Sequence, residues 1–171
     1  MRERDQQDFE DFFVANWGAI FRTAYLLTGD HHLSQDLSQI AFSKAYRAWD
    51  RVRGMDHPRA YVRKTLVNET VSWRRRRSSG EVPTLDLPAV HTPGPDASLP
   101  GSLALWAAVL HLPPRQRAVI VLRYYEDLSE SEIADELGIA LGTVKSTASA
   151  ARAALATRLN TDNEVSSRGG A

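Results

Sequence analysis

A proline-rich stretch near the middle of the chain is the feature that most limits how this sequence can fold. Five of the eight prolines and three of the glycines fall within residues 78–101 of the 171-residue chain. Proline removes a backbone N–H donor and fixes one backbone angle, so a segment so rich in it cannot continue a helix or join the centre of a sheet. We expect a flexible, extended linker that reaches roughly 80 Å at about 3.3 Å per residue.

The sequence on both sides of this linker is typical of helices. Apolar residues recur at intervals of three and four, and no long run alternates between apolar and polar residues as a strand would. We therefore predict an all-α protein with two small helical domains, at residues 1–77 and 102–159, joined by the linker at 78–101. Residues 160–171 are small and polar, and they are expected to form a disordered tail.

The composition excludes several classes of protein. The chain has no cysteine, so it has no disulfide, thiolate metal site or cysteine nucleophile. Its five histidines show no metal-binding spacing, and no phosphate-binding glycine loop or Ser-His-Asp arrangement is present, so we expect no enzyme, catalytic residue, metal or cofactor. The sequence has neither an apolar run of about 20 residues nor a signal peptide, and we expect a cytoplasmic protein without membrane insertion.

The net charge of zero conceals one strongly basic segment. Residues 51–77 carry nine basic and two acidic side chains, whereas the whole chain has 21 of each. A block of this kind is either a solvated helix face or a surface that binds a polyanion.

The first two expected helices of the N-terminal domain pack through apolar faces. The first carries an amphipathic stripe and ends near Gly29, and Asp30 is expected to cap the second, which runs to about Arg51. Between two apolar faces of the second helix lies a polar row, which is either solvated or binds a partner. The row consists of Asp36, Gln39, Ser43 and Arg47.

The third expected helix begins near Pro58 and ends in four arginines. At 100° per residue, one outer stripe of this helix combines an aromatic ring, an amide, a hydroxyl and two cations. These groups suit base stacking, hydrogen bonding to base edges and phosphate neutralisation, so the stripe favours contact with nucleic acid over a merely solvated face. It consists of Tyr61, Lys64, Asn68, Ser72 and Arg75.

The C-terminal domain has the pattern of a helix-turn-helix. Ser129 and Glu132 form a capping box, Gly138 supplies a turn and Val144 begins the next helix, although an ordinary helical hairpin would also fit. In a helix-turn-helix the second helix enters the major groove of DNA. Its polar side chains that can contact DNA are Thr143, Lys145, Ser146, Ser149 and Arg152.

Two motifs resemble a known family. The core Leu33-Ser-Gln-Asp-Leu-Ser-Gln-Ile-Ala-Phe42, together with the basic helix ending at Arg77, resembles region two of the extracytoplasmic-function (ECF) group of bacterial sigma factors. The segment 112–129, followed by Leu141-Gly-Thr-Val-Lys-Ser146, is similar to region four of the same group. Ile40 departs from this pattern, since many members are acidic there, and Ser72 replaces a frequent aspartate.

The resemblance implies a subunit that recognises promoters and directs transcription initiation. The polar row would bind the largest subunits of RNA polymerase core, and the helix from Thr143 would read the minus-thirty-five element. The stripe would contact the minus-ten element, with the loop that carries Arg53 and Met55 receiving an unstacked base of the melted strand. The linker's reach agrees with the roughly 25 base pairs, about 85 Å, between the two elements. An anti-sigma factor is a candidate further partner.

Two other functions fit parts of the sequence. A helix-turn-helix regulator would bind operator DNA on its own, usually as a symmetric dimer, whereas a sigma factor would bind DNA weakly without polymerase. A helical adaptor would bind protein only, and would then tolerate loss of Lys64 and Arg75.

Overall fold

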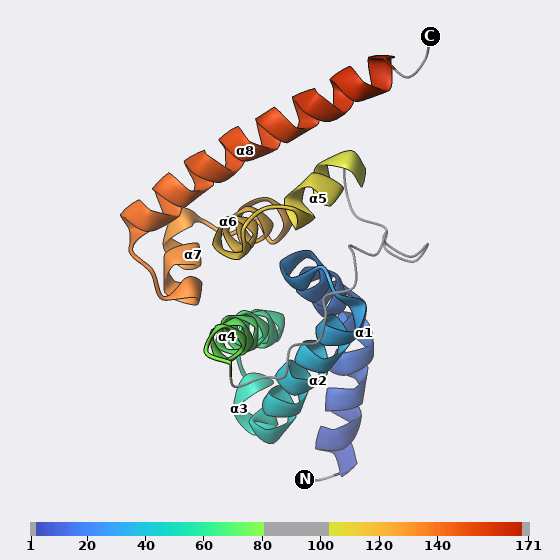
Figure 1. Cartoon of the computed structure of the whole chain (residues 1–171). Helices are drawn as coiled ribbons and strands as arrows, with labels where there is room; N and C mark the ends of the chain where they lie inside the picture. The colour runs from blue at the N-terminus through green and yellow to red at the C-terminus, as the bar shows by residue number, and fades with distance from the viewer. Residues whose placement is uncertain (1–2, 81–102, 169–171) are drawn as a thin grey trace. The chain divides into compact units, whose positions relative to one another are not determined.

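A computed structural model describes residues 3–80 and 103–168, with backbone alone after residue 165. The described residues form helices and turns without a strand, which confirms the all-α prediction (Figure 1). Contacts divide the chain into two compact units, Met1–Ala89 and Val90–Ala171. From residue 81 onwards the predicted linker lies outside the described residues, as does the end of the predicted tail after 168.

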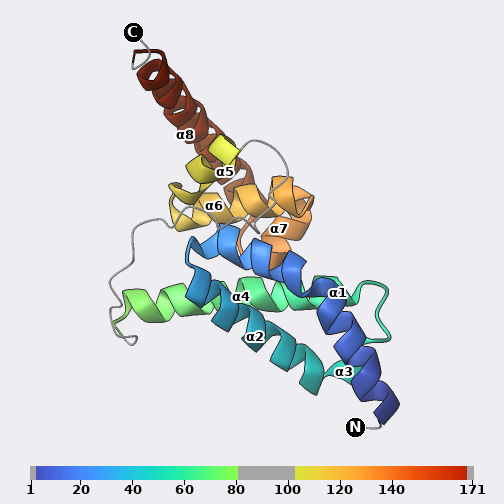
Figure 2. The ribbon, with the colours of Figure 1, turned by 90° about the vertical axis from the view of Figure 1, so that its right-hand side faces the viewer.

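The N-terminal unit consists of three long helices and one short one. These are α1 (Glu3–Thr28), α2 (His31–Arg47), α3 (Trp49–Val52) and α4 (Pro58–Ser78). Helices α1, α2 and α4 each pack against the other two (Figure 2). Their apolar faces bury Ile20, Leu37 and Leu66 almost completely.

Aromatic rings attach the first half of α1 to the rest of this unit. Phe13 packs edge to face on Phe42 of α2, with ring centroids 4.9 Å apart. Phe9 packs in the same way on Trp49 of α3, at 5.1 Å. Such pairs add about 0.5–1.5 kcal/mol beyond the apolar area that they bury. The N-terminal turns of α1 are therefore held against the body of the unit.

The ends of the helices follow the local sequence signals in most places. Gly29 has a φ of 71° after α1, and the Leu33 N–H donates to the Asp30 carboxylate over 2.8 Å at the start of α2. The second helix ends at Arg47, however, and not near Arg51 as predicted. Ala48 leaves the helical region, with a φ of −107° and a ψ of 16°, and this bend allows Trp49 to turn into the core.

The C-terminal unit is built from shorter elements and one long final helix. These are α5 (Leu103–Leu110), α6 (Pro114–Ile120), the π-helical turn η1 (Val121–Tyr125), α7 (Glu130–Leu137) and α8 (Leu141–Arg168).

The predicted helix-turn-helix is formed by α7 and α8. In the capping box, the Glu132 N–H donates to Ser129 Oγ over 3.2 Å, and the Ser129 N–H donates to the Glu132 carboxylate over 2.8 Å. Gly138 adopts a φ of 64° after α7, which a side chain would disfavour. Val144 and Ala148 of α8 are buried against the unit.

Helix α8 is longer than the sequence predicts at both ends. It begins at Leu141 and continues to Arg168, so the tail expected to be disordered from residue 160 is helical up to that point. No glycine or proline occurs between Thr143 and Arg168, and the Thr161 hydroxyl donates to the Thr157 carbonyl over 3.0 Å. Among the described residues, no helix is both long and apolar enough to cross a membrane.

Candidate nucleic-acid and protein interfaces

The polar row on α2 lines one shallow hollow. Asp36, Gln39, Ser43 and Arg47 are all exposed, and they line a hollow of about 560 Å³ together with Ile40 and Lys44. Sequence reasoning found the row but did not include the last two residues, although both lie one helical turn from a member of it. The hollow has an apolar wall, because Ile40 is 39% exposed, and charged residues of opposite sign at its two ends.

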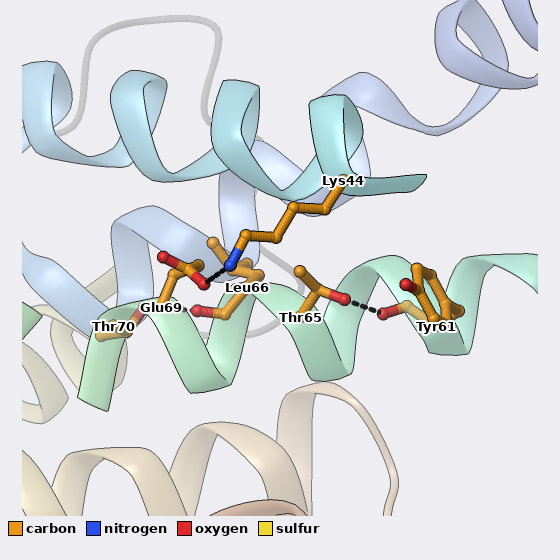
Figure 3. A network of polar contacts seen from close by, with 6 residues as sticks. All are labelled: Lys44, Tyr61, Thr65, Leu66, Glu69 and Thr70. Atoms are coloured by element: carbon orange, nitrogen blue, oxygen red, sulfur yellow. Dashed lines mark hydrogen bonds and ion pairs between the residues drawn. The ribbon is translucent and has the colours of Figure 1, made fainter. Parts of the chain in front are cut away.

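An ion pair joins the edge of this hollow to α4. Figure 3 shows Lys44 reaching from α2 to the Glu69 carboxylate on α4. The Lys44 side chain is 48% exposed, so the pair is screened by water and contributes at most about 1 kcal/mol. In the same view the hydroxyl of Thr70, a buried residue, donates to the Leu66 carbonyl over 2.8 Å, which satisfies that polar group within the helix.

The predicted stripe along α4 is only partly open to solvent. Lys64, Asn68 and Arg75 are exposed, whereas Tyr61 and Ser72 are half-buried. The Arg51 guanidinium lies 5.6 Å from the centroid of the Tyr61 ring, and one of its nitrogens is 3.4 Å from the Tyr61 hydroxyl. The aromatic group of the stripe is therefore paired with a cation that sequence reasoning had not connected to it.

The four arginines at the end of α4 have different surroundings. The Arg74 guanidinium donates to the Leu27 carbonyl at the C-terminal end of α1. The Arg77 guanidinium lies 5.3 Å above the Trp73 ring. Arg75 and Arg76 are exposed. No local signal in the sequence indicates the role of Arg74, since its partner is 47 residues away.

The loop between α3 and α4 carries the two other predicted minus-ten residues. Met55 is 37% exposed. Arg53 is 40% exposed at its side chain and forms ion pairs with carboxylates of α1 and α3. The sequence predicts Arg53 as a minus-ten contact, and in the structure three carboxylates lie around its guanidinium.

The start of α8 presents the side chains predicted to contact the minus-thirty-five element. Lys145, Ser146, Ser149 and Arg152 are exposed, and Thr143 is half-buried. The Ser146 hydroxyl donates to the Thr143 carbonyl over 3.1 Å, so its oxygen remains available as an acceptor. The exposed members of the set lie along successive turns of one helix.

Tyr124 is a residue of this surface that sequence reasoning missed. It lies in η1, its side chain is 54% exposed, and its hydroxyl is 3.3 Å from a guanidinium nitrogen of Arg152. The Arg123 guanidinium lies 5.9 Å from its ring centroid. A π-helical turn contains one residue more than an α-helical turn, so the α-helical period used for the prediction could not place Tyr124.

A half-buried arginine forms a hydrogen bond within the C-terminal unit. One guanidinium nitrogen of Arg117 donates to the Leu112 carbonyl over 3.2 Å. Burial lowers the pKa of Arg117, because water solvates its positive charge less well there.

Both units match models of one protein family. The model for sigma-70 region 2 matches residues 12–80, and the model for sigma-70 region 4 matches residues 102–155. An RNA polymerase sigma-E factor of Streptomyces antibioticus is 34% identical, over 94% of this chain and 89% of the relative. The chain belongs to the sigma-70 family. The motifs in both units had predicted this family.

Further comparisons place the chain among the ECF sigma factors. The ECF RNA polymerase sigma factor SigL of Mycobacterium tuberculosis is 32% identical, over 74% of this chain and 75% of the relative. The solved sigma factor RpoE of Bartonella quintana, in complex with the anti-sigma factor NepR, has a TM-score of 0.69 and 28% identity, and covers 91% of this chain and 99% of that one. The predicted function of a sigma factor in transcription initiation is thus confirmed, and a regulator that acts alone is not favoured.

Proposed function

We propose that each of the three surfaces serves one step of promoter recognition. The α2 hollow binds RNA polymerase core, α4 and the loop after α3 contact the melted minus-ten strand, and the start of α8 binds the minus-thirty-five duplex. The observation that carries this proposal is the α2 hollow, because all four residues of the polar row lie exposed around it. The combination of charged, amide and apolar side chains on one exposed helix face suits a protein partner.

The minus-ten surface combines charge with stacking. Lys64 and Arg75 neutralise phosphates, and Asn68 can hydrogen-bond to a base edge. Flipping a base out of the duplex costs a few kcal/mol, and stacking on an aromatic ring returns about 1–3 kcal/mol per base. The exposed Met55 offers an apolar contact for such a base in the loop. Strand opening therefore needs no nucleotide hydrolysis by this chain.

The minus-thirty-five surface is suited to moderate affinity. Lys145 and Arg152 hold phosphates, and the three hydroxyl side chains can hydrogen-bond to phosphate or to a base. Two further exposed positions on these turns, Ala150 and Ala153, offer only methyl groups. Binding through α8 is accordingly weak until the polymerase holds the rest of the chain on the promoter.

The remaining partners follow from this role. The chain acts in the cytoplasm as a subunit of the polymerase, and it performs no catalysis and needs no cofactor. An anti-sigma protein is a further partner, supported by the similar Bartonella quintana sigma factor that was solved with one.

Run-off transcription with a library of random promoters tests the proposed function. We expect the full chain with RNA polymerase core to produce RNA from a subset of templates that share two elements. If no template gave RNA, and the chain alone bound a palindromic duplex tightly, the regulator alternative would be correct.

A paired substitution tests the α2 hollow. Asp36→Arg with Gln39→Ala should weaken binding to polymerase core about ten-fold or more, because charge reversal replaces an attraction by a repulsion. The matched control is Asp11→Arg with Gln7→Ala on α1, which alters an exposed aspartate and glutamine that are hydrogen-bonded to each other at 3.0 Å. Equal binding by both variants in a competition assay would remove the hollow from the polymerase interface.

A further inference from the structure

Three carboxylates surround Arg53. The Asp5 carboxylate of α1 forms an ion pair with the Arg53 guanidinium. The carboxylates of Asp8 on α1 and Asp50 on α3 lie 4.0 Å and 3.4 Å from guanidinium nitrogens of the same residue. One positive charge therefore faces three negative charges. This is the reverse of what a free phosphate-binding arginine requires.

The acidic residues of α1 are held in place by the core. Asp5 and Asp8 precede Phe9 by one helical turn and by one residue. The Phe9 ring packs edge to face on Trp49 at 5.1 Å and on Tyr46 at 4.9 Å. Helix α1 thus fixes the position of both carboxylates beside the loop. The side chain of Asp5 is only 13% exposed, so this carboxylate is largely covered where it meets Arg53.

This arrangement changes how Arg53 can bind a phosphate. A free cation that binds a phosphate of single-stranded DNA releases about 0.7 counterion. If Arg53 is already neutralised by Asp5, its transfer to a phosphate leaves that carboxylate without a partner. Little counterion is then released, and the exposed carboxylates repel the incoming strand.

We propose that two carboxylates, Asp5 and Asp8, which we call the acidic pair, keep Arg53 from binding single-stranded DNA. A phosphate of the DNA must first displace the acidic pair from the Arg53 guanidinium. The acidic pair acts through Arg53, and its two members are positioning residues that contact no DNA themselves. The proposal deepens the proposed function, on which it rests, because it assumes that the loop meets the melted strand. The sigma factor would then have low affinity for stray single strands and would engage the loop only where the polymerase presents a strand to it.

The strength of the contact suits such a competition. Asp5 is largely covered, but Asp8, Asp50 and Arg53 are open to water, and ion pairs that water reaches usually alter an equilibrium constant by only a few-fold. The Arg53 side chain is 40% exposed, so a phosphate can reach it from solvent. A strand held close by the polymerase can therefore displace the acidic pair, whereas a strand in free solution gains little by doing so.

The test measures the affinity of the full chain for a fluorescent pool of random-sequence single-stranded DNA at several salt concentrations. The variant Asp5→Asn with Asp8→Asn removes two charges next to Arg53. The control variant Glu10→Gln with Asp11→Asn removes two charges from the same helix. The control carboxylates are hydrogen-bonded to Gln6 and Gln7, and not to an arginine.

We expect the variant of the acidic pair to bind the pool about two- to five-fold more tightly than the control variant. Its plot of log affinity against log salt should be steeper than that of the control by up to about 0.7. Both differences should disappear when Arg53→Gln is added to each variant, since the acidic pair then has nothing to withhold. Thermal unfolding of each variant checks that the N-terminal unit remains folded.

Three results would overturn the proposal. The first is equal affinity and slope for the acidic-pair variant and its control. The second is a difference that persists in the Arg53→Gln background. The third is weaker binding by the acidic-pair variant, which would mean that these carboxylates hold Arg53 ready for DNA. The titration contains no polymerase, so its failure leaves run-off transcription intact, whereas absence of transcription by the unaltered chain contradicts the proposed function itself.

Discussion

The two units achieve defined shapes by different means. In the N-terminal unit, rings from α1 interlock with Phe42 and Trp49 and fix three long helices against one another. In the C-terminal unit, helices as short as seven or eight residues meet at turns whose backbone angles are special. Asp127 and Gly138 both have positive φ there, at 57° and 64°. Interlocked rings therefore distinguish the N-terminal unit, and short helices joined at a turn with a positive φ at a non-glycine residue, Asp127, distinguish the C-terminal unit.

The two units also differ in how residues that stabilise the fold are arranged relative to residues predicted to bind DNA. Charged residues of the N-terminal unit serve both purposes, since Arg74 binds a backbone carbonyl and its neighbour Arg75 is exposed. In the helix-turn-helix the structural roles fall on the capping box and on Gly138, whereas the predicted contacts with DNA lie on α8. Substitutions should consequently be easier to interpret in the C-terminal unit.

The largest effect is expected from Phe42→Ala. Phe42 is 3% exposed and packs against several rings of α1, and removal of a buried phenylalanine ring typically costs about 3–5 kcal/mol. The N-terminal unit should unfold at much lower denaturant, while the C-terminal unit is unaffected. Hydrogen exchange followed by mass spectrometry of peptides from each unit measures this. The control is Val14→Ala at a position that is 77% exposed, and equal losses in both units would contradict independent stability.

The next effect distinguishes two adjacent arginines. Arg74→Ala should lower the free energy of unfolding of the N-terminal unit by about 2 kcal/mol, because a charged hydrogen bond to the end of α1 is lost. Arg75→Ala should leave stability unchanged and weaken binding to single-stranded DNA. Denaturation and DNA titration of both variants provide the comparison. If the two variants behaved alike, the arginine run would have one role and not two.

A smaller effect is expected at the turn of the helix-turn-helix. Gly138→Ala should destabilise the C-terminal unit by about 1 kcal/mol, because its φ of 64° disfavours any residue with a Cβ. Apart from Gly138 itself and its chain neighbours, no atom lies within 4 Å of the Cβ that would be added, so the cost comes from the local backbone and not from tertiary packing. Gly142→Ala, within α8, should be neutral or slightly stabilising. Chemical denaturation of both variants checks this, and a loss at Gly142 that equalled the loss at Gly138 would contradict it.

The smallest effect concerns one proposed phosphate contact. Lys145→Ala should reduce the salt dependence of duplex binding by about one unit of slope and leave stability unchanged. Fluorescence anisotropy of a labelled promoter duplex at several salt concentrations measures the slope. An unaltered slope would remove Lys145 from the phosphate contacts.

Local signals in the sequence predicted the fold well. The cap at Asp30, the capping box at Ser129 and the turn at Gly138 each depend on residues close together in the chain, and the structure confirms all three. The predicted end of the second helix was wrong, because the chain bends at Ala48 without a helix-breaking residue in the sequence, and Trp49 after the bend is buried. The length of α8 was wrong because low apolar content was taken to predict disorder.

The surfaces were harder to predict than the fold. Helical periodicity placed the polar row on one face of α2, where the structure shows a hollow. It could not show that Arg53 meets Asp5, because these residues are 48 positions apart. The contact of Tyr124 with Arg152 was equally hidden, since it depends on a π-helical turn. The assignment of individual residues to polymerase and to DNA remains a prediction that the experiments above test.

The unbroken course of α8 has a practical use. At 1.5 Å per residue, Val165 lies about 36 Å along the helix axis from Leu141. The chain contains no cysteine, so Val165→Cys would create a unique attachment point for a dye. This position is 67% exposed and several turns away from Thr143. A dye there could therefore follow binding to a labelled promoter in real time without touching the residues proposed to contact the duplex.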